Sequence, residues 1–309
     1  MRSLPLGLMT ITAAGFVLLS VLRPDFLSAF NLFVLMQTVA LSMLIALGQM
    51  MVIALGQMNL SLGSIGGLVG IVFAGLMQVW HLPPLLALMA GLLLGAAAGC
   101  FNGWMTARAG LSAFVVTLAT MAAFKGLNLG ITEAQPFYGI PASVKAAGTA
   151  SILGPVPLLL VPAALAAGLI AFALNRLPIG RQILAVGGNS HAAELSGIGL
   201  SRAVVWAHLL SGLLAGIAGM MAVARLQIGQ PTIGDDWLIP SFAAPVIGGS
   251  VLSGGSVSVA GTICGVVIVT LITQALVLFR VDPYYVQFVL GALILAVVSA
   301  NQMRAARSA

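Results

Sequence analysis

The chain has 309 residues, of which 61% are hydrophobic and 6% are charged. Soluble domains carry about 25% charged residues, so this composition excludes an ordinary water-soluble protein. The net charge of +6 comes from 12 scattered basic residues without a Lys/Arg-rich run, which argues against a nucleic-acid partner. A membrane span takes about 20 apolar residues, so the chain is long enough for about ten spans with little mass outside the membrane.

Apolar runs divided by polar, proline or glycine residues mark the predicted spans. They cover residues 4–22, 31–55, 61–80, 84–107, 112–132, 156–175, 203–224, 240–252, 259–279 and 284–301. The eighth run is too short for a straight crossing. We therefore expect an all-α polytopic membrane protein of about ten transmembrane helices, which forms one transmembrane domain over residues 1–309.

Arginine and lysine predict the orientation of these spans. If both termini are cytoplasmic, the inner loops hold Arg2, Arg108, Arg176, Arg181, Arg202, Arg304 and Arg307. The outer loops then hold Arg23, Lys145, Arg225 and Arg280. An excess of basic residues on the inner side agrees with the positive-inside rule, so we expect both termini in the cytoplasm.

Two connections are long enough to hold structure of their own: an outer loop at 133–155 and an inner loop at 176–202. In the inner loop, Asn189 or Ser190 can cap the start of a helix, and Gly197 can end it after about two turns. This short helix is either an interfacial connector between two spans or a docking helix for a cytoplasmic partner. The residues themselves favour neither interpretation.

Glycines recur every four residues in the fourth run, at Gly91, Gly95, Gly99 and Gly103. This spacing forms one stripe along a helix, and such stripes let two helix backbones approach closely in lipid. The same spacing recurs at 63/67, 66/70, 212/216 and 261/265. We expect all of these glycines to pack helices together.

The hexapeptide IALGQM occurs twice, at residues 45–50 and 53–58. Helical periodicity would bring Gln49 and Gln57 to one side, where they either line a polar path or hydrogen-bond to neighbouring helices. The segment MNLSLGSIGGLVG that follows, residues 58–70, mixes polar residues and glycines between two apolar runs. It predicts a break in the helix.

A second interrupted segment, residues 234–261, carries Pro240, Pro245 and two pairs of glycines. Two such segments, one in each half of the chain, are typical of inverted-repeat transporters. Non-helical backbone persists inside a membrane only where protein or a water-filled cavity satisfies it. We therefore expect a cavity, and a substrate route, between the two segments.

Several kinds of chemistry have no support in the sequence. The phosphate-loop pattern G-x-x-x-x-G-K-[ST] does not occur, so this chain is not expected to hydrolyse ATP itself. Cys100 and Cys264 lie in apolar runs and are expected to pack there, while His81, His191 and His208 lack metal-ligand spacing and are expected on loops or helix surfaces. Acids are nearly absent from the predicted spans, which disfavours coupling to protons or sodium. We expect neither a catalytic nor a metal site.

Five segments in order along the chain carry a resemblance: ALGQMMVIALGQMNLSLGSIGGL, FNGWMTARAGLSAFVVTLATMAAFKGL, IGRQILAVGGNSHAAELSGIGLSR, LSGLLAGIAGMMAVARL and PVIGGSVLSGGSVSVAGTICG. Together they resemble the permease subunits of bacterial ABC importers for monosaccharides, of the ribose type. The resemblance implies an inverted-repeat ABC permease fold in the bacterial inner membrane. It implies a pore of two permeases, which are two copies or a copy and a paralogue. It further implies cytoplasmic ATPase subunits that bind ATP and Mg²⁺, and a periplasmic sugar-binding protein, while this chain binds no cofactor.

The resemblance also implies that the short helix of the inner loop is the coupling element, which favours the docking interpretation. The coupling residues it assigns are Gly188, Asn189, His191, Ala192, Ala193, Glu194, Leu195 and Gly197. Glu194 departs from the family pattern, where a basic residue is usual. Asn59 stands where the family has an aspartate, and its amide can still hydrogen-bond a sugar hydroxyl.

The leading hypothesis is a permease subunit that carries a monosaccharide or a similar small neutral polyol. ATP binding in the partner pushes the helix at 188–197, and the route opens alternately outward and inward. Neutral polar residues are the candidates for lining this route: Gln37, Gln57, Asn59, Ser61, Thr117, Thr120 and Ser253. Two alternatives stay open, a branched-chain amino-acid-type ABC permease and a stand-alone facilitator without an ATPase.

Overall fold

The computed structural model describes residues 3–282, 285–292, 295–296 and 299. In this part of the chain helices predominate. They are α1 Ser3–Leu22, η1 Pro24–Leu27, α2 Ala29–Ile53, α3 Leu62–Gln78, α4 Pro84–Arg108, α5 Ala113–Thr132, α6 Ala142–Thr149, α7 Leu160–Arg176, α8 Pro178–Gly188, α9 Ser190–Leu195, α10 Leu200–Leu226, α11 Leu238–Ile247 and α12 Val259–Leu278. Two short strands, β1 Ser151–Leu153 and β2 Val156–Pro157, form an antiparallel hairpin.

The first nine predicted runs each overlap one of these helices: α1, α2, α3, α4, α5, α7, α10, α11 and α12. Among the described residues, α2, α4, α5, α10 and α12 are long and apolar enough to cross a membrane. Helices α7 and α8 meet at 71° and count as a sixth span if they form one broken crossing. The tenth run, 284–301, falls partly outside the described residues, so the total of ten spans stays a prediction.

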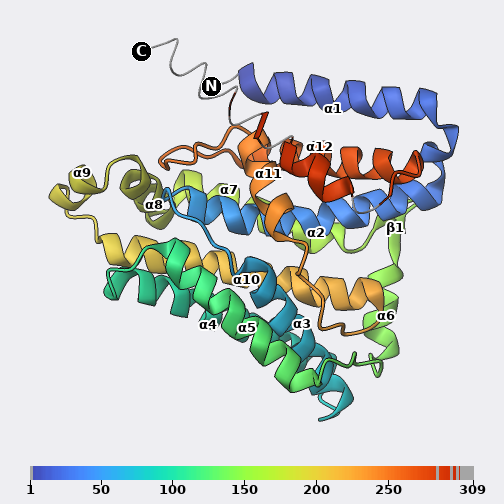
Figure 1. The fold of residues 1–309 in the computed structure, drawn as a ribbon, viewed down its shortest axis with the longest axis horizontal. Coiled ribbons are helices and arrows are strands. Elements are labelled where there is room, and N and C mark those ends of the chain that lie inside the picture. The colour runs from blue at the N-terminus through green and yellow to red at the C-terminus, as the bar shows by residue number, and fades with distance from the viewer. Residues whose placement is uncertain (1–2, 283–284, 293–294, 297–298, 300–309) are drawn as a thin grey trace.

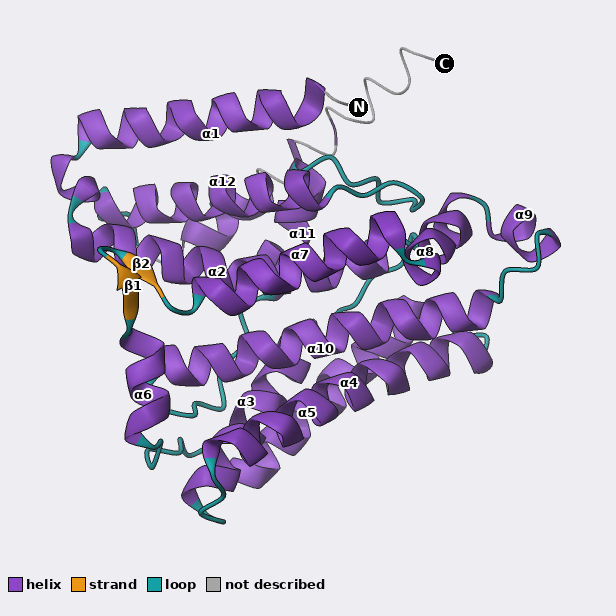
Figure 2. Cartoon of the chain, turned by 180° about the vertical axis from the view of Figure 1, so that it is seen from behind, coloured by secondary structure: helices purple, strands orange, loops and turns teal. Residues whose placement is uncertain are grey.

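The long helices lie side by side, and α10 packs against α2, α3 and α4 (Figure 1). Helix α12 lies between α1 and α2, while α4 and α5 flank the other side of the bundle (Figure 2). Helices α8 and α9 lie at one end of the bundle, and α6 with the β1–β2 hairpin lies at the opposite end (Figure 1). The two long predicted loops are therefore at opposite ends of the molecule.

The core of the bundle is formed by the second half of α2 and by α10. Every residue from 43 to 55 is buried, which explains why this stretch is apolar all round. Large apolar side chains on α4 and α7 point outward instead; Leu93 is 70% exposed and Leu169 is 67% exposed. An exposed apolar surface of this kind is what lipid would cover.

Helix α4 packs against α10 along the predicted glycine stripe. A Cβ atom at Gly95 would crowd the carbonyl oxygen of Gly212, and one at Gly99 would overlap the carbonyl oxygen of His208. Gly103 lies over Val205 in the same way. The two helices approach this closely because α4 presents no side chain along the stripe.

The outer loop holds structure of its own, as its length predicted: it contains α6 and the β1–β2 hairpin. Gln37 in α2 explains the position of α6: its Nε2 donates a hydrogen bond to the Gly148 carbonyl oxygen at 2.7 Å. The turn of the hairpin contains Gly154, which has a φ of 54°. The residues on either side of it are apolar, so from the sequence alone they are equally compatible with the start of a membrane span. The all-α prediction therefore missed this small hairpin.

Candidate functional site

The helical path is interrupted between α2 and α3, at residues 54–61, and this differs from the prediction: of the predicted segment 58–70, residues 62–70 are helical and belong to α3. Helix α2 ends at Ile53, and Gly56 then has a φ of 71°, in the left-handed region that favours glycine. The expectation that Gln49 and Gln57 share one helical face is therefore wrong, because the helix ends between them. The repeated hexapeptide has two different conformations.

Asn59 anchors the break to two long helices. Its Nδ2 donates to the Ser211 hydroxyl of α10 at 2.9 Å, and its Oδ1 accepts from the Ser61 hydroxyl at 2.8 Å. Asn102 of α4 donates in turn to the Ser61 hydroxyl at 2.7 Å. All four side chains are fully buried. The break is thus held by buried hydrogen bonds to two long helices, although the Asn102 Oδ1 atom has no partner among the described residues. Non-helical backbone inside a membrane needs protein contacts of this kind.

The glutamines of the two hexapeptide copies, Gln49 and Gln57, also make polar contacts with neighbouring segments. With its amide oriented to match its surroundings, Gln49 donates to the Asn59 carbonyl oxygen at 3.0 Å and accepts from the Asn59 N–H at 3.2 Å. The Oε1 atom of Gln57 lies 3.2 Å from Nε2 of His208. His208 is fully buried, so its predicted place on a helix surface is wrong. The fold uses these side chains for interhelical hydrogen bonds.

The candidate lining residues do not gather around one cavity. Five of the seven are buried: Gln37, Asn59, Ser61, Thr117 and Thr120. The Thr117 hydroxyl accepts a hydrogen bond from the Leu60 N–H at 3.1 Å, and Gln37 binds α6 at the far end of α2. Gln57 is half-buried and Ser253 is exposed. Their role in lining a route stays a prediction.

A pocket of about 320 Å³ does lie between the two interrupted segments. Met58 and Leu60 of the break face Leu238, Ile239, Phe242 and Val246 of α11, and Leu252 completes the lining. The sequence predicted a cavity at this place, but with polar walls. Each of these lining residues is apolar, because the polar side chains of the break turn inward to α4 and α10.

The coupling segment consists of α8 and α9. Asn189 caps α9: its Oδ1 accepts from the Ala192 N–H at 3.0 Å. Gly197 ends the turn with a φ of 78°. Ala193 is buried and holds α9 to the protein, while Leu195 is 78% exposed. The predicted bounds and caps of this helix match the structure closely, and α9 protrudes from the end of the bundle (Figure 1).

The exposed residues of the coupling segment surround Ala193. They are Gly188, Asn189, His191, Ala192, Glu194, Leu195 and Gly197. Leu195 and Glu194 are exposed on a protruding helix, and no ion pair of Glu194 is found within the described residues. Such a helix has the shape of a contact for another molecule.

The C-terminal end of α8 touches the chain after α2 and the chain after α11 at one point. We call this point the glycine junction, and it comprises residues 54–56, 187–188 and 253–255. The Gly255 N–H donates to the Ala54 carbonyl oxygen at 2.9 Å. A Cβ atom at Gly187 would overlap the same carbonyl oxygen, and one at Gly254 would crowd the N–H of Gly56. Three backbones meet where no side chain fits. The sequence showed the paired glycines but not that they meet.

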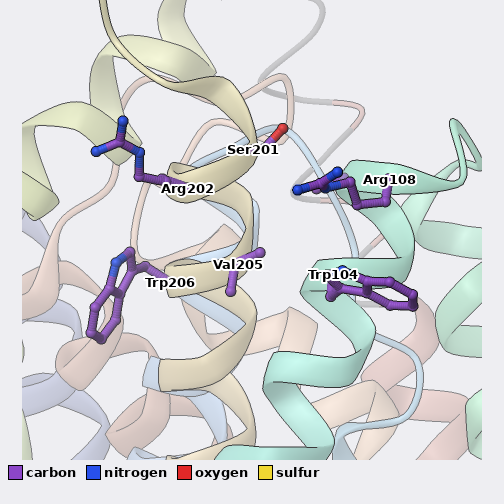
Figure 3. Close-up of a pocket in the computed structure, with 7 residues that line it drawn as sticks. Trp104, Arg108, Ser201, Arg202, Val205 and Trp206 are labelled. Carbon is purple, nitrogen blue, oxygen red and sulfur yellow. The ribbon is translucent and has the colours of Figure 1, made fainter.

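A further pocket of about 210 Å³ lies where α4 ends and α10 begins (Figure 3). On each helix an arginine lies one turn from a tryptophan: Arg108 and Trp104 on α4, Arg202 and Trp206 on α10. Tryptophan rings and arginine side chains are typical of the boundary between membrane and water. This end of the bundle, next to α9, therefore has the character of a membrane surface.

Within the described part of the chain, no group of three or more His, Cys, Asp or Glu side chains could hold a metal ion. Cys100 and Cys264 are both free thiols. Long apolar helices, two interrupted segments and a helix, α8, whose end contacts both of them define the class: a multi-pass membrane protein of the kind that transports solutes.

Comparisons with known proteins identify the family. A family described as "Branched-chain amino acid transport system / permease component" matches residues 31–298, and the chain belongs to this permease family. The ribose import permease protein RbsC of Bacillus subtilis is 35% identical over 94% of this chain and 90% of its own length. The D-allose transport system permease protein AlsC of Escherichia coli is 32% identical, over 91% of this chain and 86% of its own length. The xylose transport system permease protein XylH of Escherichia coli is 31% identical, over 88% and 85%. No solved structure matches the chain.

Proposed function

We propose that the chain is the transmembrane permease subunit of an ATP-driven importer that carries a monosaccharide, or a similar neutral polyol, across the bacterial inner membrane. One observation carries this proposal: the protruding helix α9 directly follows the C-terminal end of α8. That end lies in the glycine junction, against both interrupted segments. A force on α9 therefore has a direct path to the segments that would open and close a route. The curated relatives, which are permeases of sugar transport systems, support the choice of substrate class.

In this proposal the chain itself does no chemistry and binds no cofactor. Partner ATPase subunits bind ATP and Mg²⁺ and hold α9 in a groove. Leu195 supplies the apolar contact, and Glu194 pairs with a basic residue at the rim of the groove. When the ATPases close, α8 moves, and the contacts of Gly187 with Ala54 and Gly255 pass the displacement to both interrupted segments.

The proposal also assigns an orientation in the membrane and a partner to each end and to one side of the bundle. Both termini and α9 face the cytoplasm, ten spans form one transmembrane domain, and α6 with the β1–β2 hairpin faces a periplasmic sugar-binding protein. Of the basic residues behind this orientation, Arg2, Arg304 and Arg307 lie outside the described residues. A second permease, either a copy or a paralogue, covers the apolar pocket between α11 and the break and completes the route.

A branched-chain amino-acid permease is the second candidate, because the family description names that substrate. An amino acid carries two charges, and transporters commonly aim helix N-termini or fixed charges at its carboxylate. The pocket between α11 and the break has only apolar walls. Uptake of labelled L-leucine, but not of D-ribose, D-allose or D-xylose, would support this candidate.

The docking role of α9 is tested by two matched leucines. Leu195 on α9 is 78% exposed, and Leu153 in β1, at the opposite end, is 80% exposed. We expect Leu195→Asp to abolish co-purification of an ATPase with the chain from its native membrane in mild detergent, as read by mass spectrometry. Leu153→Asp should leave the ATPase in place. Equal recovery of ATPase with both variants would contradict docking through α9, and a wild-type chain that purifies alone would favour a stand-alone facilitator.

A further inference from the structure

The segment between α10 and α11, residues 227–237, crosses α3 on its glycines. A Cβ atom at Gly63 would overlap the carbonyl oxygen of Gly234, and one at Gly67 would overlap that of Ile233. The indole ring of Trp237 lies against Gly66. The sequence predicted that this glycine stripe packs two helices together. Half of it instead accommodates an irregular segment, which can then lie flat on the bundle.

Two further contacts fix this segment in place. The Nδ2 of Asn128 in α5 donates to the Pro231 carbonyl oxygen at 2.8 Å. Phe137 and Gly229 form a two-way backbone bridge. The segment is therefore an ordered part of the bundle, at the end of α10 that lies away from α9.

A pocket of about 390 Å³ opens between this segment and the end of α10. Such a volume falls within the range of roughly 300–1,000 Å³ that is typical of small-molecule sites. Its polar lining consists of Arg225, Gln230, Thr232, Asp235 and Asp236, and the Trp237 ring forms part of its wall. We call it the Asp236 pocket. The walls combine polar groups with an aromatic surface, in contrast to the apolar pocket between α11 and the break.

Some of the polar side chains of the Asp236 pocket are not used by the fold. Asp235 pairs with Lys125 at 2.9 Å, and Arg225 donates to the Thr38 hydroxyl at 3.1 Å. Within the described residues, the side chains of Gln230, Thr232 and Asp236 make no hydrogen bond or ion pair. Around this pocket, therefore, a carboxylate, an amide and a hydroxyl are left to bind a solute.

The charges and shapes of these groups define the kind of solute. Asp235, Asp236 and Arg225 line the pocket, and Lys125 pairs with Asp235, so the formal charges of the four groups cancel and a neutral ligand fits best. Carboxylate and amide oxygens accept hydrogen bonds from hydroxyl groups, and guanidinium and amide N–H groups donate to them. The flat indole of Trp237 offers an apolar surface to the C–H face of a ring.

From these observations we infer that the Asp236 pocket binds a monosaccharide through its hydroxyl groups and is the entry vestibule of the transport route. Asp236 accepts hydrogen bonds from neighbouring hydroxyls, Gln230 and Arg225 donate to ring or hydroxyl oxygens, and Trp237 stacks on the sugar. This inference rests on the proposed function, because the pocket is periplasmic only in the orientation proposed above.

The test measures sugar binding to the full chain in lipid nanodiscs, with D-ribose, D-allose, L-arabinose and D-xylose as separate labelled probes. For at least one probe we expect saturable binding, with affinity at least tenfold weaker in Asp236→Ala than in the wild type. Asp25→Ala, which removes an exposed aspartate far along the chain, should bind like the wild type. Equal affinity in the wild type and Asp236→Ala would overturn the inference.

A second measurement places the sugar at the ring. Trp237 is one of only 4 tryptophans, so the probe that binds should change the intrinsic fluorescence of the wild type. Trp237→Phe should lose this change and retain binding of the labelled probe. If the fluorescence change persists in Trp237→Phe, stacking on this ring is wrong.

Uptake in whole cells separates this inference from the proposed function. Normal uptake of a probe by cells with the wild-type chain, together with no binding by the purified chain, would overturn the vestibule and leave the permease intact. We expect instead that Asp236→Ala raises the KM for uptake with little change in maximal rate. If the wild type takes up none of the four sugars, the proposed function fails, and the vestibule fails with it.

Discussion

Two groups of polar side chains in this protein look alike in sequence and are used in opposite ways. Around Asn59 the amides and hydroxyls are buried and bonded to one another, so they hold a broken helix in place. At the Asp236 pocket the side chains of Gln230, Thr232 and Asp236 make no hydrogen bond or ion pair within the described chain. A polar residue between apolar runs therefore indicates function only when its neighbours leave its hydrogen-bonding groups free. In a membrane protein, polar groups that are hydrogen-bonded to one another are to be read first as stabilising the fold.

The largest effect is expected from Asn59→Leu, which removes the centre of the buried group. Ser211 loses its partner, and the Ser61 hydroxyl and N–H lose their acceptor. Each orphaned buried group costs about 1–3 kcal/mol, so with three groups orphaned the free energy of unfolding should fall by at least about 3 kcal/mol. Thermal unfolding in detergent measures this. Asn175→Leu, which removes an exposed asparagine that bonds only within its own helix, is the control and should change little.

A smaller effect is expected from Asn59→Asp. The Oδ1 acceptor for Ser61 is kept, and the Ser211 hydroxyl can rotate to donate to the second oxygen. We expect a loss of stability of about 1 kcal/mol, since one neutral hydrogen bond is exchanged and a charge enters a buried site that already supplies donors. If Asn59→Asp unfolds as readily as Asn59→Leu, the hydrogen bonds described here are not what holds the break.

Removal of the ion pair at the Asp236 pocket should matter less still. Lys125 and Asp235 are each nearly half exposed, and pairs of this kind contribute about 0–1 kcal/mol. Lys125→Met should therefore lower the unfolding temperature only slightly at low salt and not at all at high salt. A loss that is independent of salt would show that Lys125 acts through packing and not through charge.

The smallest effect on stability is expected from Asp236→Asn, although this change lies in the proposed vestibule. The carboxylate has no partner within the described residues, so the free energy of unfolding should change by no more than about 0.5 kcal/mol. Thermal unfolding beside the wild type checks this. A marked loss of stability would mean that Asp236 serves the fold, and the contrast with Asn59 would disappear.

Local patterns in the sequence predicted the local structure well. Asn189 and Gly197 bound α9 because capping depends on residues close in the chain. The glycines of α4 predicted a close contact with another helix, which is α10 in the structure, since only small residues allow such a close approach. These features need no knowledge of which distant segments meet.

Apart from the local β1–β2 hairpin, the missed features depend on distant contacts. Asn59 bonds to Ser211, 152 residues away, and nothing near Asn59 distinguishes a buried amide from one that lines a route. The same limit applies to the glycine junction and to the Asp236 pocket. For the latter one local signal was available: the sequence Asp-Asp-Trp follows Gly234 in a loop, and a paired acid beside an aromatic residue is unusual so close to apolar spans.

The glycine junction also determines how faithfully motion would travel. A contact between two side chains can absorb a small displacement, because a side chain can change its rotamer. Backbones that touch directly have no rotamer that could absorb the displacement. A shift of α8 would therefore reach the break and the loop after α11 at the same moment and nearly undiminished. The two interrupted segments would therefore move together, without a lag between them.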